Sequence, residues 1–436
     1  MRNIRKVVVL GANGAMGSGA AAVFASAGVP TVLLARNVEK AEAGKARADQ
    51  LTKGKIPTHL LRCGDYGHDM AELIGDADLI LECVSEDLAC KREMFERVEH
   101  MKREDAIVAT VSSGLSIAEM SQGMSDGFRR HFLGIHLFNP PTVITGCELI
   151  PHLGTDPGVV AAVRDFLTSV CRREVVECAD TPAFAGNRLG FKVLNEVAQL
   201  AEEHGVAFVD QLVGPHTGRA LPPLATIDLV GWDVHKAIVE NLFARTHDVA
   251  HDKFRLPPYM QRMIDKGHLG RKTRDKGGFF RVEGKGADMK TFVLDPRSGD
   301  YRLLSEVAPP VPAFIERMKA ALRTHDHRGA MEVLCSAPDH EAELLRRILL
   351  GYISYGLGLV GEVVDRPRDI DRIMGYGFNW APPSVLVDAI GPGRTIVMLE
   401  KAKLPVPTPI LEAATHQRAL FNEPRVDSAR FFLVAA

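Results

Sequence analysis

The 436-residue sequence lacks the features that mark secreted, membrane-spanning or nucleic-acid-binding proteins. Its seven cysteines are scattered and none forms a C-x-x-C pair, which indicates reduced thiols rather than a disulfide framework or a zinc site. The formal net charge of −2 provides no excess of positive charge for binding nucleic acid. The apolar run near the N-terminus is too short for the hydrophobic region of a signal peptide. We therefore expect a cytoplasmic protein without a metal site.

Long apolar runs are also absent. The longest, Ile348 to Val364, is broken by glycines and falls short of the ~20 residues that a membrane span requires, so we expect a buried helix there and no membrane span. Hydrophobic residues make up 46% of the chain and charged residues 25%, as in ordinary globular proteins with a sizeable core. The length predicts two or three domains.

The N-terminal segment has the pattern of a dinucleotide-binding unit. An apolar strand over Lys6 to Leu10 leads into a glycine-rich turn, an alanine-rich helix to Ala27 and a second strand over Thr31 to Leu34. Strand, turn, helix and strand in this order form a βαβ unit with a parallel sheet. We predict a Rossmann-type, doubly wound α/β domain over residues 1–182. Further strands are expected at His59–Leu61, Leu79–Leu81, Ala106–Ala109 and Gly134–Phe138.

The glycine-rich turn predicts a pyrophosphate site. Glycine lets the backbone approach a phosphate that lies on the N-terminus of the following helix. The spacing is G-x-x-G-x-x-G, one residue longer in its first half than the usual fingerprint. The cofactor-binding residues expected in this turn are Gly11, Gly14, Met16 and Gly17.

The end of the second strand leaves the choice of cofactor open. An acidic residue there normally binds the ribose hydroxyls of NAD, but this chain has Ala35-Arg36. The missing carboxylate removes a repulsion against a 2′-phosphate, and arginine can pair with that phosphate, so Arg36 suggests NADP. Alternatively, Arg36 is a solvated loop residue.

A histidine in the stretch Gly134-Ile-His-Leu-Phe-Asn-Pro-Pro141 is the candidate catalytic base. Histidine as a residue type can take up and release a proton near neutral pH, and here Glu148 follows His136 twelve residues later. A histidine can take a proton from a carbinol while a hydride leaves its carbon, and a carboxylate on the other ring nitrogen fixes the tautomer. A histidine buried for packing is the alternative.

From Ala185 the pattern becomes helical and contains a weak internal repeat. Val209-Asp210 precedes Pro222-Pro223 and Asp228, as Ile370-Asp371 precedes Pro382-Pro383 and Asp388. We therefore predict an all-α C-terminal region with a duplicated helical subdomain. A hairpin over 291–301 and a proline-rich linker interrupt it. The predicted parts are residues 183–290 for the first helical domain, 291–340 for the hairpin and linker, and 341–436 for the second repeat.

These motifs together resemble the 3-hydroxyacyl-CoA dehydrogenases of fatty-acid β-oxidation, specifically the dehydrogenase part of bifunctional proteins that also carry an enoyl-CoA hydratase domain. The resemblance runs from Ile4 through the Gly377-Phe378-Asn379-Trp380 segment to about Gly393. No hydratase domain follows, so we expect the hydration step to be absent. The resemblance implies catalytic roles for His136, Glu148, Ser113 and Asn187, and cofactor-side roles for Asn139, Glu86, Lys91 and Lys272.

The resemblance implies reversible oxidation of an (S)-3-hydroxyacyl-CoA to the 3-ketoacyl-CoA with NAD. Two departures bear on this: Val111 replaces the family's asparagine near the nicotinamide, and Ala35 replaces its aspartate. Alternatives are a related β-hydroxyacid dehydrogenase acting on a substrate without coenzyme A, and a non-catalytic NADP-binding sensor. The candidates for binding the coenzyme A tail are Lys40, Lys45, Arg47, Lys53 and Lys55. Alternatively, most of these basic residues form a solvated helix face.

The resemblance also bears on assembly. Single-copy relatives dimerise through the helical domain, so a second copy within the chain can cover the same surface. We expect a monomer or a homodimer with a reduced interface.

Overall fold

The computed structural model describes residues 3–423, 426 and 428–432. The chain divides into two compact units. The first comprises Met1–Phe184 with Tyr376–Phe378, and the second comprises Ala185–Gly375 with Asn379–Ala436. Each unit is described by itself.

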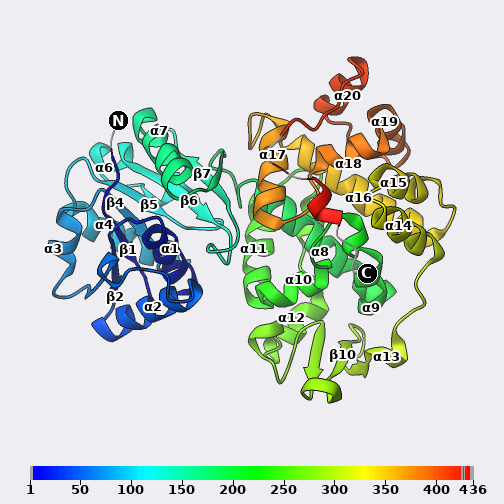
Figure 1. The fold of residues 1–436 in the computed structure, drawn as a ribbon, viewed down its shortest axis with the longest axis horizontal. Helices are drawn as coiled ribbons and strands as arrows, with labels where there is room; N and C mark the ends of the chain where they lie inside the picture. Colours follow the sequence, from blue (N-terminus) through cyan, green and yellow to red (C-terminus); the bar gives the residue numbers. More distant parts are fainter. Residues whose placement is uncertain (1–2, 424–425, 427, 433–436) are drawn as a thin grey trace. The chain divides into compact units, whose positions relative to one another are not determined.

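The first unit is built on a sheet of eight strands in the order β3-β2-β1-β4-β5-β6-β7-β8 (blue to cyan in Figure 1). The strands from β3 to β6 are parallel, and β7 runs antiparallel to β6. The strands are β1 Val7–Leu10, β2 Thr31–Ala35, β3 Leu61–Asp65, β4 Leu79–Glu82, β5 Ile107–Thr110, β6 Phe132–Leu137, β7 Gly146–Pro151 and β8 Glu174–Glu177.

Helices connect and cover these strands. Their bounds are α1 Ala15–Ser26, α2 Val38–Leu51, α3 Met70–Gly75, α4 Leu88–Met101, α5 Ile117–Met120, α6 Asp126–Arg130 and α7 Pro157–Asp165, which continues as a π-helical turn to Val170.

The Rossmann-type expectation for this unit is confirmed, with its central strands forming the core. All four residues of β1 and all five of β2 are buried, as expected for strands covered on both faces. Small residues let α1 pack closely on the glycine-rich turn: a Cβ at Gly17 would stand 2.5 Å from the Gly11 carbonyl oxygen. These contacts fix the turn at the carboxyl end of β1.

Three details of the sheet differ from the prediction. Residues 58–60 form a 3₁₀ turn, and the third strand begins only at Leu61. β7 and β8 were not predicted. Because β7 returns antiparallel beside β6, the sheet is mixed, and this reversal positions the candidate catalytic pair.

The second unit is mainly helical (green to red in Figure 1). Its helices are α8 Gly186–His204, α9 Val206–Leu212, α10 Pro223–Val230, α11 Trp232–Arg245, α12 Pro258–Asp265, α13 Leu304–Val307, α14 Ala313–Arg323, α15 His327–Ser336, α16 His340–Gly358, α17 Pro367–Ile373, α18 Pro383–Ile390, α19 Pro392–Lys401 and α20 Thr408–Thr415.

A small three-stranded sheet interrupts these helices, and the C-terminal region is otherwise helical, as expected. The expected hairpin is present as β10, Lys290–Leu294, paired antiparallel with β11, Tyr301–Leu303. A third strand, β9 at Phe280–Glu283, pairs with β10 and was not predicted.

The sequence repeat corresponds to recurring hydrogen bonds. Asp210 accepts a hydrogen bond from the backbone N–H of Leu224 at 2.8 Å, and Asp371 accepts one from Ser384 at 3.1 Å. Asp228 and Asp388 each cap a later segment by accepting two consecutive backbone N–H groups. Corresponding carboxylates therefore make similar hydrogen bonds in both segments of the sequence repeat, three of them buried and Asp388 half-buried.

The long apolar run forms most of α16, which is largely buried and ends at Gly358; the residues up to Val364 form turns. Across the described part of the chain, no helix combines the length and apolarity needed to cross a bilayer.

Candidate active site

A histidine and a glutamate face each other across β6 and β7. His136 and Glu148 are direct partners in the antiparallel register, and His136 Nδ1 lies 2.6 Å from Glu148 Oε2. The histidine is 4% exposed and the glutamate 0%. The predicted pair is thus brought together by strand pairing, which holds it more rigidly than loops would.

Aromatic rings surround His136. Phe138 and Phe184 lie with their ring centroids 4.8 and 5.7 Å from the imidazole. Phe378, from the short segment of the C-terminal region that belongs to this unit, packs edge-on against Phe138 at 5.7 Å. These rings exclude water from one side of the pair and restrict the rotation of the imidazole.

The geometry suits a general base. Glu148 occupies Nδ1, so the neutral imidazole carries its proton on that nitrogen and presents Nε2 as the acceptor. The carboxylate also stabilises the imidazolium formed when Nε2 takes a proton. Cys178 approaches the other carboxylate oxygen, with Sγ 3.5 Å from Oε1. Both oxygens of Glu148 therefore have partners.

The glycine-rich turn fits a dinucleotide. Gly11 has φ +74°, and a Cβ there would stand 2.4 Å from the Cys83 carbonyl oxygen, so only glycine suits this position. The 12-residue helix α1 begins at Ala15, after the N-cap Gly14, without a side-chain cap, which leaves its first N–H groups available for a pyrophosphate. Met16 and Gly17 lie in the first turn of this helix.

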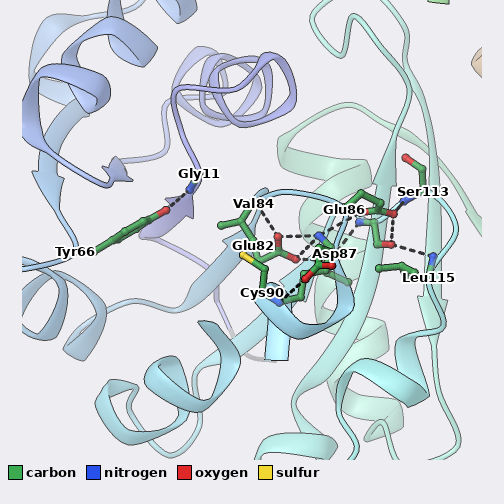
Figure 2. Close-up of polar contacts among 12 residues, drawn as sticks. Gly11, Tyr66, Glu82, Val84, Glu86, Asp87, Cys90, Ser113 and Leu115 are labelled. Atoms are coloured by element: carbon green, nitrogen blue, oxygen red, sulfur yellow. Dashed lines mark hydrogen bonds and ion pairs between the residues drawn. The ribbon is translucent and has the colours of Figure 1, made fainter. Parts of the chain in front are cut away.

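A cavity of about 640 Å³ opens beside this turn. It is lined by Gly11, Gly14 and Arg36 among the predicted residues. Tyr66, which follows β3, also lines it and accepts a hydrogen bond from the Gly11 N–H at 2.6 Å (Figure 2). The cavity extends from the pyrophosphate turn to the end of β2, as an adenosine pocket must.

A charge network lies at the end of β4, with Glu82 and Lys91 buried and Glu86 46% exposed. Lys91 Nζ is bound to both oxygens of Glu82, at 2.8 and 2.9 Å, and lies 3.3 Å from Glu86. Glu86 in turn accepts hydrogen bonds from the Ser112 hydroxyl and the Ser113 N–H (Figure 2). The network thus links β4 to the loop that carries the predicted substrate-contacting serine.

Burial and pairing set the protonation of these groups. Burial raises the pKa of Glu82 above its usual value, in spite of the adjacent Lys91. Burial also acts to raise the pKa of Glu86, but Lys91 and the bonds from Ser112 and Ser113 outweigh it and leave the pKa below its usual value. Burial tends to lower the pKa of Lys91, and the two glutamates reverse this and raise it. Glu86, in the loop after β4, is therefore an anion that accepts hydrogen bonds from the Ser113 loop.

The remaining predicted residues are Asn139, Asn187 and Lys272. Asn139 follows β6 in an exposed loop. Asn187 is buried in the first turn of α8, in the second unit. Lys272 is also in the second unit, where its Nζ pairs with Asp233 at 2.7 Å. Their roles toward cofactor and substrate stay predictions.

Sequence reasoning did not find several neighbours of these sites. Tyr66 and Cys178 belong to no motif, and their positions depend on the pairing of strands. Glu82 had a signal: it is an acidic residue ending an otherwise apolar strand, nine residues before a lysine that proves to be buried.

A mainly parallel sheet of the dinucleotide-binding type, with a histidine–glutamate pair on two of its strands and a helical unit after it, defines a protein of the dehydrogenase type. Comparisons with known proteins agree. Residues 6–181 match the family model described as "3-hydroxyacyl-CoA dehydrogenase, NAD binding domain", and residues 184–279 match "3-hydroxyacyl-CoA dehydrogenase, C-terminal domain". The chain belongs to the 3-hydroxyacyl-CoA dehydrogenase family, which confirms the resemblance seen in its motifs.

Individual relatives extend the match. A probable 3-hydroxyacyl-CoA dehydrogenase of Bacillus subtilis is 31% identical over 93% of this chain and 53% of its own length. The crystal structure of FadB2 of M. tuberculosis is 30% identical with a TM-score of 0.59, over 64% of this chain and all of that one. A 3-hydroxybutyryl-CoA dehydrogenase structure of Escherichia coli shares the fold over 95% of this chain and 99% of its own, at 20% identity and TM-score 0.68.

The chain spans little more than half the length of the first curated relatives that it matches, 53% and 56%.

Proposed function

We propose that the protein catalyses the reversible oxidation of an (S)-3-hydroxyacyl-CoA to the 3-ketoacyl-CoA, with a nicotinamide dinucleotide as hydride carrier. The observation that carries this proposal is the buried pair of His136 and Glu148 in the same unit as a dinucleotide-type glycine turn. When bound, the nicotinamide supplies the hydride acceptor or donor. The protein's residues supply proton transfer and positioning.

In the direction of oxidation, His136 Nε2 accepts the proton of the C3 hydroxyl as the hydride leaves C3. Glu148 keeps the imidazole in the right tautomer and stabilises its positive charge afterwards. In the reverse direction the imidazolium returns the proton to the ketone oxygen. We assign Ser113 and Asn187 to hydrogen bonds with substrate oxygens, which would hold C3 in a reactive orientation.

A second cavity, of about 700 Å³, supports a coenzyme A substrate. It lies between the C-terminal ends of α1 and α2, Thr142 of the loop after β6, and residues 170–173. Lys53, Lys55 and Arg172 line it, and the described residues lining it include no carboxylate. Coenzyme A carries a pyrophosphate and a 3′-phosphate, and such a cationic surface complements them.

Two of these cations have strained backbones. Lys53 and Arg172 have φ of 55° and 54°, in the left-handed region that favours glycine. Neither forms an ion pair with another residue that the structure describes. Neither cation is therefore neutralised by a described acid, which is consistent with a phosphate site. Of the basic residues expected to meet coenzyme A, Lys40, Lys45 and Arg47 do not line this cavity.

The test is oxidation of reduced cofactor with acetoacetyl-CoA and with a longer 3-ketoacyl-CoA. The wild type should turn over, and His136→Ala should lose about 10²–10⁴ in kcat while cofactor affinity stays near normal. His131→Gln is a matched control, since its ring nitrogen contacts the Gly127 carbonyl at 2.8 Å rather than a carboxylate. Near-wild-type turnover in His136→Ala would remove the assignment.

A parallel comparison tests the coenzyme A part of the proposal. Free 3-hydroxybutyrate should be a far poorer substrate than its CoA thioester. Lys53→Gln and Lys55→Gln should raise KM for the thioester several-fold without changing kcat, whereas Lys40→Gln, in the preceding helix α2 and outside the cavity, should not. Equal activity on the free acid would favour a β-hydroxyacid dehydrogenase.

We further infer that the second helical copy covers the surface through which single-copy relatives associate. In this unit α8 packs against α16, where a Cβ at Gly356 would stand 2.8 Å from Leu189. Arg188 of α8 donates a hydrogen bond to the Tyr355 hydroxyl of α16 at 2.9 Å. Light scattering should report a monomer, and a concentration-independent dimer would contradict this.

A further inference from the structure

We propose that the adenosine pocket selects the 2′-phosphorylated dinucleotide, NADP, through Arg36 at the end of β2, with Arg97 and Tyr66 completing the pocket. This inference deepens the proposed function by choosing between two forms of the cofactor. The inference rests on the proposed function only because it assumes that the protein binds a nicotinamide dinucleotide. Its test measures cofactor binding and needs no acyl-CoA.

The pocket lacks the group that would recognise NAD. A carboxylate at the end of β2 normally accepts hydrogen bonds from the ribose 2′- and 3′-hydroxyls, and Ala35 occupies this place. Asp65, opposite Ala35 in the strand register, does not substitute for it. Its Oδ1 accepts hydrogen bonds at 2.7 Å from the N–H groups of Gly67 and His68. This carboxylate oxygen is therefore already hydrogen-bonded within the turn that follows β3.

The pocket instead offers an available cation. Arg36 lines the cavity, is exposed, and forms no hydrogen bond or ion pair with any residue that the structure describes. Its guanidinium can bind a phosphate through two parallel N–H donors. Asn37 caps the 14-residue helix α2 directly after Arg36, so the helix N-terminus adds positive potential at the same point.

A second cation, Arg97, lines the same cavity. Arg97 donates a hydrogen bond to the Tyr66 carbonyl at 2.8 Å, and its guanidinium lies 5.8 Å from the centre of the Tyr66 ring. These two contacts hold the Tyr66 ring and the Arg97 guanidinium together in the lining of the cavity, where an adenine ring can stack on them. Of the described residues lining the cavity, Glu93 is the one acid, and it is exposed. The lining therefore carries more positive than negative charge.

The experiment measures binding of adenosine 2′,5′-bisphosphate and 5′-AMP by calorimetry, and of NADPH and NADH by fluorescence. The wild-type protein should bind each 2′-phosphorylated ligand roughly tenfold more tightly than its counterpart. Arg36→Ala should abolish that difference by weakening the phosphorylated ligands, while the affinities for 5′-AMP and NADH change by less than about twofold. Thermal melts would verify that this exposed substitution leaves the fold intact.

Arg47→Ala is the matched control. Arg47 is an exposed arginine in α2, the helix that follows Arg36, and it does not line the cavity. Its removal changes the net charge by the same amount as the removal of Arg36 but leaves the pocket intact. NADH and 5′-AMP binding as tightly as their phosphorylated counterparts would overturn the proposal, as would an equal loss in Arg47→Ala. A protein that prefers NADPH but turns over no 3-ketoacyl-CoA would instead contradict the proposed function and leave this inference standing.

Discussion

Lys91 and Glu82 form an ion pair at 2.8 Å with neither side chain exposed to solvent. The pair lies where β4 ends, and Thr110 and the Val84 N–H supply further hydrogen bonds to the carboxylate. A buried charge of this kind is tolerated because its partners satisfy it. Lys91 also pairs with Glu86, which accepts a hydrogen bond from the Ser113 N–H and so connects the ion pair to the Ser113 loop.

Lys91→Met should destabilise the protein by about 3–5 kcal/mol, because it leaves Glu82 buried without its cation. The double variant Glu82→Gln/Lys91→Met should recover much of this loss. Urea denaturation measures both. Lys6→Met serves as the control, since it removes one partner of the more exposed pair with Asp76 and should cost only about 0–1 kcal/mol. Equal losses in the two single variants would contradict the argument.

Glu148→Gln should lower kcat by about 10²–10⁴ without weakening cofactor binding. An amide cannot stabilise the imidazolium, and its NH₂ group can force the wrong histidine tautomer. Steady-state turnover and NADH titration measure the two effects. Glu177→Gln provides the comparison, since Glu177 lies on the adjacent strand β8, with its side chain 44% exposed and paired with Arg164. Full activity in Glu148→Gln would show that the pair plays no part in proton transfer.

The dinucleotide unit was predictable because its signals are local. An apolar strand, glycines at a turn and an alanine-rich helix are adjacent in sequence, and steric demands at Gly11 and Gly17 account for them. The spacing of His136 and Glu148 pointed to a pair, but the sequence pattern did not reveal that β7 reverses direction. That reversal places the two side chains in direct register.

Other parts of the site depend on packing between distant segments. Phe378 reaches the wall of rings around His136 from the C-terminal region, and no periodicity in either segment indicates that contact. Tyr66 meets Gly11 because β3 and β1 lie on either side of β2. Burial of Lys91 was also unpredictable, since a lysine on a helix is usually solvated.

Arg172→Gly should separate stability from substrate binding. Glycine relieves the left-handed backbone at φ 54°, so stability should stay constant or rise by about 0.5–1 kcal/mol after the entropy cost of glycine. Loss of the cation from the basic cavity should raise KM for acetoacetyl-CoA several-fold with kcat unchanged. Lys403→Gly, at φ 57° between α19 and α20, should give a similar stability change with no effect on KM. An unchanged KM in Arg172→Gly would exclude the cavity as a phosphate site.

The second unit should lose stability in mild acid through His235. This histidine is 0% exposed, with Nε2 3.0 Å from Asn195 Oδ1, and burial lowers its pKa to about 3. Between pH 7 and 5 the unfolded chain takes up a proton on this residue while the folded protein does not, so stability falls as pH falls. The wild type should lose about 2 kcal/mol more than His235→Phe over this interval, whatever their difference at pH 7. Urea denaturation at both pH values measures the change, and parallel losses in the two proteins would show that His235 is protonated in the folded state.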